Sequence, residues 1–184
     1  MPLKLNDLES LRSAVRNGAQ LKYVFFWRHT PESAGEIGRE CLSQWYPARF
    51  DVDGVSFATA EHYMMYRKAL LFSDREAAGQ ILHAPNPGAA KSLGRSVRGF
   101  VEAVWIEQRS KIVVDGNYAK FSQSAALREY LLSTTQHVLV EASPVDRVWG
   151  IGLAADGKHA GNPLMWRGLN LLGFALMDVR DRLM

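Results

Sequence analysis

A hairpin signal that leads directly into a helix signal constrains the fold of this chain more than any other feature. Two short apolar runs, Phe50–Val52 and Val55–Phe57, flank Asp53-Gly54. Because both central residues of a type I′ turn need positive φ, Asp-Gly between such runs predicts a β-hairpin. Thr59 then supplies a good N-cap, and the residues that follow hold neither Gly nor Pro, so a helix is expected to begin near Ala60.

The predicted helix places an acid and an amine on one face. Glu61 and Lys68 are seven residues apart, close to two helical turns, and Met64 and Met65 lie between them. An acid and an amine can therefore share one pocket. The alternative is that Lys68 and Arg67 are solvated surface cations and that Glu61 only suits the helix N-terminus. Taken alone, the stretch favours this alternative, since charged residues are commonly exposed.

The composition is that of one globular domain. The chain has 184 residues, of which 47% are apolar and 22% charged, enough to bury a substantial core. Its net charge of +3 tolerates a phosphate-bearing ligand but lacks the basic stripe of a dedicated nucleic-acid binder. The lone Cys41 cannot form an internal disulfide, and no apolar run approaches membrane-spanning length. We therefore expect a cytoplasmic protein with a single domain over residues 1–184 and no membrane partner.

The rest of the chain predicts more helix than strand. Strands are expected at Leu21–Trp27 and Val138–Ala142, which are rich in β-branched and aromatic residues, and a loop is expected over Arg28–Glu40. Helical spacing and caps predict further helices over about 6–18, 74–83, 89–94, 100–116, 124–132 and 169–183. The expected fold class is α+β, a helix-rich single domain with a small β-sheet.

Particular residues set some of these helix limits. Two pairs match capping boxes and mark helix starts: Asn6 with Glu9, and Ser73 with Glu76. Gly116 is expected to end the helix that begins near Phe100, which would put Lys120-Phe121 in a turn.

The segment Ser143–Gly152 holds an acid, Asp146, and a large aromatic ring, Trp149, after a predicted strand, where functional loops commonly lie. A ligand base or sugar can stack on Trp149 while its hydroxyls bond to Asp146. Equally, Trp149 can belong to the core and Asp146 to a turn, and the sequence favours neither interpretation. Gly150–Ala155 matches a dinucleotide fingerprint, but Asp156–Lys158 turns the chain where a helix is needed, which excludes a Rossmann site.

Taken in order, segments spread along the chain resemble the NADAR family. The matching pieces are Ser43–Pro47, Phe50–Gly54, Thr59–Ala69, Leu71-Phe72, Asp74, Lys91, Leu93–Arg95, Trp105, Lys120-Phe121, Glu141–Ser143, Asp146, Trp149–Gly152, Trp166, Gly168 and Asn170–Gly173. They keep the order of the family and cover most of the chain from about residue 25 to 184.

The resemblance implies a hydrolase, an N-glycosidase that acts on ribosides. YbiA-like members cleave the bond between ribose phosphate and the pyrimidine amine in early riboflavin-pathway intermediates, and other members remove ADP-ribose from modified guanine in nucleic acid. The weak net charge favours the small phosphorylated riboside as partner. Three alternatives stay open: a glycosidase that removes ADP-ribose from nucleic acid, a non-catalytic module that binds ADP-ribose or another nucleotide, and a scaffold with only a relict pocket. The presence of both Glu61 and Lys68 favours an enzyme over the last two.

The resemblance also implies Glu61, Lys68, Asp146 and Trp149 as site residues, since each occupies its motif position. The chemistry of a C1′–N bond lets Glu61 protonate the departing amine, Lys68 form an imine with C1′, and Asp146 bind the ribose or steady its positive charge. We predict further substrate-binding residues at Trp45, Trp105, Lys120, Trp149, Gly150 and Asn170. Phosphate binding stays open among Arg28, Arg49, Arg95 and Lys120. No cofactor or metal is expected, because the histidines and Cys41 show no close ligand spacing.

Overall fold

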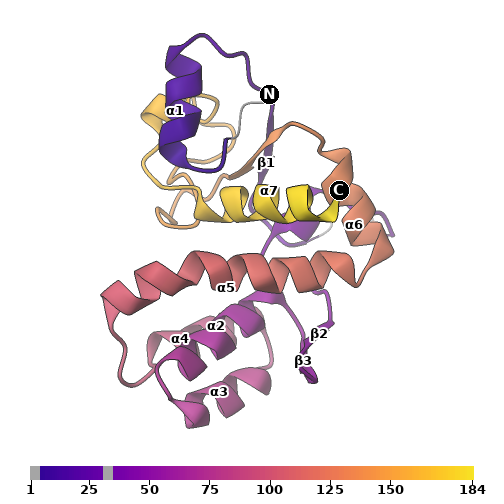
Figure 1. The fold of residues 1–184 in the computed structure, drawn as a ribbon, viewed down its shortest axis with the longest axis vertical. Coiled ribbons are helices and arrows are strands. Elements are labelled where there is room, and N and C mark those ends of the chain that lie inside the picture. Colours follow the sequence, from indigo (N-terminus) through magenta and orange to yellow (C-terminus); the bar gives the residue numbers. More distant parts are fainter. Residues whose placement is uncertain (1–4, 31–34) are drawn as a thin grey trace. The chain divides into compact units, whose positions relative to one another are not determined.

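The computed structural model describes residues 5–30 and 35–184. The chain divides into two compact units: unit 1 combines the chain up to Ser43 with Ala126–Met184, and unit 2 is Gln44–Ala125. Within the described residues there are seven α-helices, two 3₁₀ helices and four short strands (Figure 1), which confirms the helix-rich α+β class. The single domain over residues 1–184 stays a prediction.

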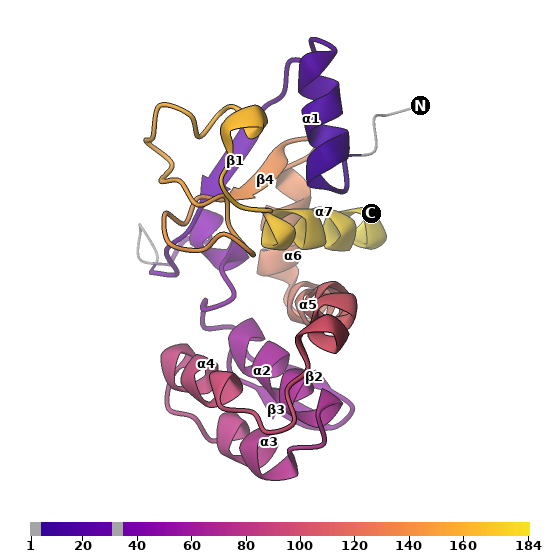
Figure 2. The same ribbon diagram turned by 90° about the vertical axis from the view of Figure 1, so that its left-hand side faces the viewer.

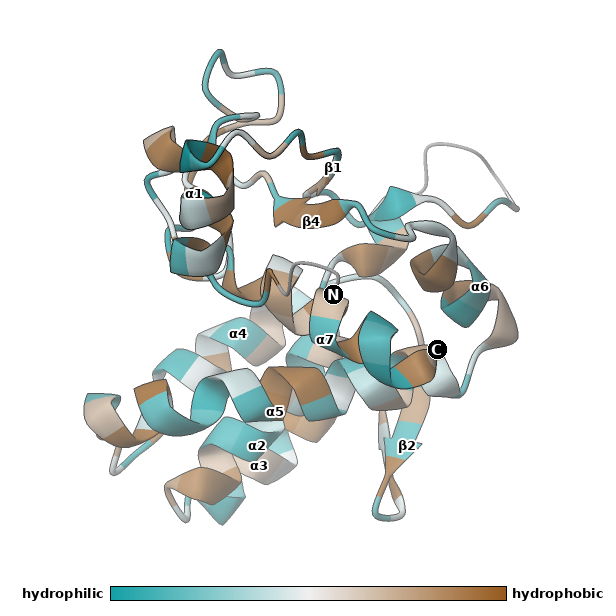
Figure 3. Ribbon diagram, turned by 45° about the horizontal axis from the view of Figure 1, so that its top comes forward, coloured by the Kyte–Doolittle hydropathy of each residue, from teal (hydrophilic) through white to brown (hydrophobic). Residues whose placement is uncertain are grey.

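Unit 1 contains a two-stranded parallel sheet. β1 (Tyr23–Phe26) pairs with β4 (Val138–Glu141), with Tyr23 opposite Val138 (Figure 2), so both predicted strands are confirmed. β4 is strongly apolar (Figure 3), and its first three residues are at most 1% exposed. α7 (Leu171–Leu183) packs against β4. The unit also contains α1 (Leu8–Arg16), η1 (Arg39–Leu42), η2 (Pro163–Met165) and, apart from its first residue, α6 (Ala125–Ser133).

Unit 2 begins with the predicted hairpin. β2 (Phe50–Val52) pairs antiparallel with β3 (Val55–Phe57), and the turn residues Asp53 and Gly54 have φ of 52° and 77°, as a type I′ turn requires. Four helices follow: α2 (Ala60–Leu71), α3 (Arg75–Leu82), α4 (Pro87–Arg95) and α5 (Glu102–Ser122). α2 packs against each of the other three (Figure 1), so it is the central element of this unit.

α2 starts where the sequence predicts. The Thr59 hydroxyl accepts a hydrogen bond from the backbone N–H of His62 at 3.3 Å, the N-cap contact that satisfies a free amide of the first turn. The His62 ring is held by the same hydroxyl at 2.8 Å and by the Ala84 carbonyl at 3.1 Å. His62 is 2% exposed and therefore ties α2 to the segment after α3.

The predicted end of a helix at Gly116 is wrong. α5 runs through Gly116 to Ser122, so Lys120-Phe121 is helical and does not lie in a turn. A Cβ at position 116 would lie 2.4 Å from Cδ1 of Tyr63 on α2. Gly116 is therefore needed for the close packing of α2 on α5, which outweighs the unfavourable helix propensity of glycine, about 1 kcal/mol.

Both predicted N-caps are displaced by one residue. Asp7, and not Asn6, caps α1, because its side chain accepts the Ser10 N–H at 2.7 Å. Asp74, and not Ser73, caps α3, because its carboxylate accepts the Ala77 N–H at 3.2 Å. Asp is as good an N-cap as Ser or Asn, so the sequence signal located each start only to within a residue.

The predicted loop over Arg28–Glu40 needs a smaller correction. Its last two residues, Arg39 and Glu40, form the first part of η1, and residues 31–34 lie outside the described residues. The strands also form two separate two-stranded sheets and not the single small sheet that the sequence predicted. None of the helices in the described ranges has the length and apolar character that crossing a bilayer requires.

Candidate functional site

Glu61 occupies the first turn of α2 in a buried position. Glu61 is only 2% exposed, and its backbone N–H donates to the Gln44 carbonyl at 3.0 Å. The N-terminal end of a helix favours a negative charge through the helix dipole. The Gln44 contact fixes the start of α2, so Glu61 is a carboxyl group held in a defined place away from bulk water.

Lys68 is half-buried against two aromatic rings. Its Nζ donates to the Gly94 carbonyl at 2.7 Å and lies 4.4 Å from the Phe100 ring centroid and 5.6 Å from that of Trp105. Burial lowers the pKa of the Lys68 amine, and the positive charge of Arg95 lowers it further. Lys68 is therefore not the solvated surface cation of the alternative interpretation.

Glu61 and Lys68 share a helix face but are too far apart along the helix to contact each other. Seven residues of α-helix separate them by about 10.5 Å along the axis, and the Lys68 ammonium is bonded to Gly94 of α4. Gly94 allows α4 to approach α2, because a Cβ there would lie 2.1 Å from the Met65 sulfur. For both groups to reach one sugar atom, Lys68 has to exchange its bond to Gly94 for the substrate.

A buried pair of amides supports the start of α2. The Asn117 Nδ2 donates to Gln44 Oε1 at 2.7 Å and to the Val113 carbonyl at 2.9 Å. Asn117 is fully buried and Gln44 is 7% exposed. Since the Gln44 carbonyl accepts the Glu61 N–H, Asn117 acts on Glu61 through Gln44. The sequence interpretation missed Asn117, because it follows the glycine that was expected to end the helix.

Lys120 lies one turn after Asn117 on α5 and is 1% exposed. Its Nζ lies 5.6 Å from the Tyr46 ring centroid and 5.0 Å from that of Phe121. A lysine buried this far from water is unusual, and it adds a cation to the same part of unit 2 as Gln44 and Asn117. Its predicted contact with substrate stays a prediction.

The two predicted tryptophans of unit 2 are both half-buried. Trp45 lies beside the first turn of α4, where a Cβ at Gly88 would be 3.5 Å from its ring, and the Lys91 Nζ is 6.0 Å from its centroid. Trp105 lies under Lys68. The structure thus brings Trp105 and Lys68 together, whereas Trp45 lies near a different cation, Lys91.

In unit 1, Asp146 shapes its own loop. Its Oδ1 accepts the backbone N–H groups of Val148 and Trp149, both at 2.8 Å, and its own N–H donates to the Ser143 hydroxyl at 3.1 Å. This is the turn role of the alternative interpretation. Among the residues that the structure describes, its other oxygen, Oδ2, makes no hydrogen bond, so a role in binding is compatible with this geometry. Trp149 is half-buried, which leaves part of its ring accessible.

Gly150 and Asn170 are used by the fold. A Cβ at Gly150 would lie 2.8 Å from the Glu141 carbonyl. Asn170 is fully buried with φ of 54°, and its amide accepts from the Glu141 N–H and donates to the Leu139 carbonyl, both at 2.9 Å. Both residues therefore join their loops to β4, and their predicted contacts with substrate stay predictions.

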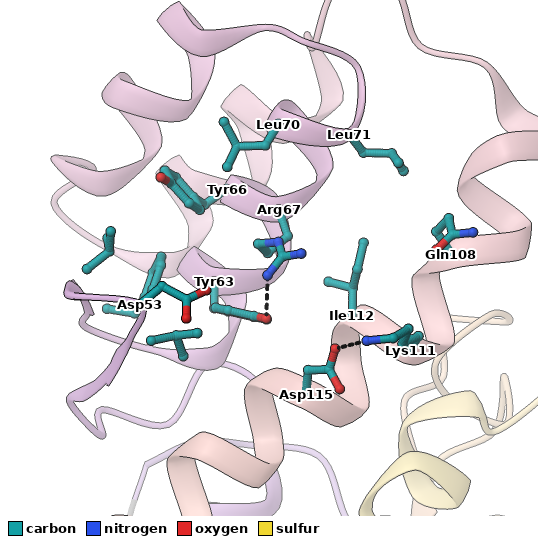
Figure 4. Close-up of a pocket in the computed structure, with 13 residues that line it drawn as sticks. Asp53, Tyr63, Tyr66, Arg67, Leu70, Leu71, Gln108, Lys111, Ile112 and Asp115 are labelled. Carbon is teal, nitrogen blue, oxygen red and sulfur yellow. Dashed lines mark hydrogen bonds and ion pairs between the residues drawn. The ribbon is translucent and has the colours of Figure 1, made fainter.

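None of the nine predicted residues lines the cavity of about 530 Å³ in unit 2 (Figure 4). The β2–β3 hairpin, α2 and α5 form it. No signal in the sequence pointed to this cavity, because it depends on how three separated segments pack. As for metals, the described residues contain no group of three or more His, Cys, Asp or Glu side chains placed to hold an ion.

Comparison with known proteins places this chain in a family. The model of the NADAR domain matches residues 25–184. The chain belongs to the NADAR family. Within NADAR it is 41% identical over 165 residues to N-glycosidase R617 of Acanthamoeba polyphaga mimivirus, covering 87% of this chain and 95% of that protein. It is 33% identical over 132 residues to N-glycosidase YbiA of Escherichia coli strain K12, covering 72% of this chain and 74% of YbiA.

The fold agrees with this NADAR assignment. The NMR structure of E. coli YbiA superimposes with a TM-score of 0.70 and 28% identity, over 90% of this chain and 86% of that chain. The predicted family and α+β fold are thereby confirmed. So is the predicted enzyme class, a hydrolase of N-glycosyl bonds, since several NADAR relatives are N-glycosidases.

Proposed function

We propose that this protein hydrolyses the C1′–N bond of phosphorylated ribosyl-amines, and that its substrates are the aminopyrimidine ribosyl phosphates of the early riboflavin pathway. One observation carries the proposal: Lys68, an amine whose pKa is lowered by burial and by Arg95, lies on the same face of α2 as the buried carboxyl of Glu61. An acid and a deprotonatable amine are what the cleavage of a glycosylamine needs.

Glu61 is the proposed acid. Breaking a C1′–N bond builds positive charge on the sugar, and the departing amine needs a proton. A carboxyl that is 2% exposed and anchored through Gln44 delivers that proton from a fixed position, so little rearrangement is needed at the moment of reaction.

Lys68 is the proposed nucleophile. Its neutral amine adds to C1′, and the C1′–N bond breaks with its electron pair going to the departing amine. Glu61 gives that amine a proton and then takes one of the two protons of the Lys68 nitrogen. As the sugar ring opens, the ring oxygen takes the second proton, which leaves an imine between Lys68 and C1′. Water then hydrolyses the imine, which frees the sugar phosphate and restores Lys68. A buried lysine beside a second cation is a recognised way to obtain a neutral amine.

Arg95 is the proposed phosphate ligand. Among the four basic residues considered from the sequence, only Arg95 acts electrostatically on Lys68, and its side chain is exposed at the end of α4. A substrate whose C1′ reaches Lys68 carries a phosphate on the same sugar, so a cation next to Lys68 is suitably placed to bind it. For Asp146 and Trp149 we retain the proposed roles of binding ribose hydroxyls and stacking on the base.

The test incubates the protein in parallel with a 5-aminopyrimidine ribosyl phosphate and with DNA that carries ADP-ribosylated guanine. We expect release of the free aminopyrimidine and a sugar phosphate from the first substrate. Glu61→Gln should lose this activity, whereas the matched control Glu107→Gln, an exposed carboxyl on α5, should keep it. Cleavage of the DNA substrate alone would overturn the proposed substrate but leave the N-glycosidase class intact.

A further inference from the structure

The cavity of unit 2 lies on the face of α2 that points away from Glu61 and Lys68. At about 100° per residue, Lys68 lies about 20° around the helix from Glu61, whereas Tyr63, Arg67 and Leu70 lie about 180–240° from it. These three residues line the cavity. The cavity is thus separate from the proposed active site, although the same helix carries both.

The walls of the cavity are mostly apolar. Side chains from all three of its elements contribute, among them Val52 and Val55 of the hairpin, Tyr66 and Leu70 of α2, and Ile112 of α5. Leu70 is 40% exposed, so part of this apolar surface is open to solvent. A volume of about 530 Å³ falls within the range of small-molecule sites.

The polar groups of the cavity leave one cation without a charged partner. Lys111 and Asp115 neutralise each other in an ion pair at 2.5 Å. Arg67 forms no ion pair with any residue in the described ranges; its Nη1 donates to the Tyr63 hydroxyl at 3.2 Å, and its guanidinium lies 5.7 Å from that ring. Figure 4 shows Arg67 at the centre of the cavity, between Asp53 and the Lys111 and Asp115 pair.

Tyr63 orients Arg67 without neutralising it. Burial raises the pKa of the Tyr63 phenol, so the hydroxyl is uncharged at neutral pH and serves as an acceptor for Arg67. The ring itself is 1% exposed and packed between Phe50 and Phe57. Its rigid position holds one edge of the guanidinium, and a planar fork of N–H donors remains for a carboxylate.

We infer that this cavity binds a small organic acid with a single carboxylate and an apolar or aromatic body, with the carboxylate paired to Arg67. The charges of Arg67, Lys111, Asp53 and Asp115 sum to zero, and Asp53 faces the cavity from the hairpin turn. A dianion such as a phosphate monoester would be repelled by Asp53 more strongly than a monoanion. The inference is independent of the proposed glycosidase reaction.

The test titrates the intact protein with phenylacetate and measures binding by calorimetry and by backbone amide NMR shifts. We expect a dissociation constant in the micromolar to millimolar range, with shifts concentrated in the β2–β3 hairpin and on the face of α2 that carries Tyr63, Arg67 and Leu70. Phenylacetamide, which lacks the charge, and phenyl phosphate, which carries two, should each bind at least roughly tenfold more weakly. Equal binding of phenylacetamide, or shifts that do not involve α2 and the hairpin, would overturn the inference.

Variants distinguish a specific contact between Arg67 and the carboxylate from a general effect of positive charge on binding. Arg67→Gln should weaken phenylacetate binding at least roughly tenfold, and Arg67→Lys, which keeps the charge but loses the planar fork, should fall between it and the unaltered protein. Asp53→Asn should strengthen binding severalfold. The matched control Arg75→Gln changes an exposed arginine of α3 in the same unit and should leave binding unchanged. Unweakened binding by both Arg67 variants in folded protein would refute the site.

Discussion

Replacing Gly116 by alanine tests the packing that positions α2. The added Cβ would meet three atoms of the Tyr63 ring, Cδ1 at 2.4 Å, Cε1 at 2.8 Å and Cγ at 3.2 Å. The ring has little room to move, because Tyr63 is 1% exposed and its ring packs against that of Phe57 at a centroid distance of 5.1 Å. Overpacking of this kind destabilises by about 1–3 kcal/mol, while alanine improves helix propensity by about 1 kcal/mol.

Gly79 of α3 provides the matched control, because a Cβ there meets no atom within 4 Å. Gly79→Ala should therefore gain up to about 1 kcal/mol in the free energy of unfolding. The propensity term cancels between the two variants, so Gly116→Ala should be less stable than Gly79→Ala by about 1–3 kcal/mol. Urea unfolding of both proteins gives this difference. Equal stability of the two variants would refute the account of how α2 packs on α5.

Three further predictions concern the site and its supports. Glu61→Gln should lower turnover roughly 10²–10⁴-fold with little change in melting temperature; near-normal turnover would remove Glu61 as the acid. Trp149→Ala should weaken ligand binding by about 1–3 kcal/mol, and a large fall in the melting temperature without ligand would assign the ring to the core instead. Hydrogen bonds from the Arg98 side chain and backbone hold the pKa of Asp74 well below its usual range. The free energy of unfolding should therefore decline as pH falls below about 4, and this decline should be smaller in Asp74→Asn. Denaturation measured across pH tests this, and an equal decline in both proteins would contradict the prediction.

The parts of the fold that the sequence predicted depend on neighbours along the chain. Asp53-Gly54 specifies a type I′ turn by itself, and Thr59 caps the helix that follows within three residues. The error at Gly116 has the opposite origin. Helix propensity alone disfavours glycine, but the ring of Tyr63 from another helix occupies the space that a side chain would need, and this contact has no signature in the local sequence.

The candidate site shows the same division. Helical periodicity was enough to place Glu61 and Lys68 on one face. It did not show that the Lys68 amine is bonded to Gly94 and lies against Phe100, since these residues belong to α4 and to the segment after it. The support of Glu61 through Gln44 and Asn117 also joins segments far apart in the chain, so only the folded structure reveals it.

Trapping the covalent intermediate tests the central claim most directly. Borohydride is added during turnover of the aminopyrimidine ribosyl phosphate, and peptides are then analysed by mass spectrometry. The proposed mechanism predicts that the mass of the reduced sugar fragment appears on the peptide that contains Lys68, and that Lys68→Ala loses both adduct and turnover. Lys68→Arg should also be inactive, since a guanidinium keeps the charge but cannot serve as the amine nucleophile. Full turnover by Lys68→Arg, or an adduct on Lys120 in place of Lys68, would contradict the mechanism.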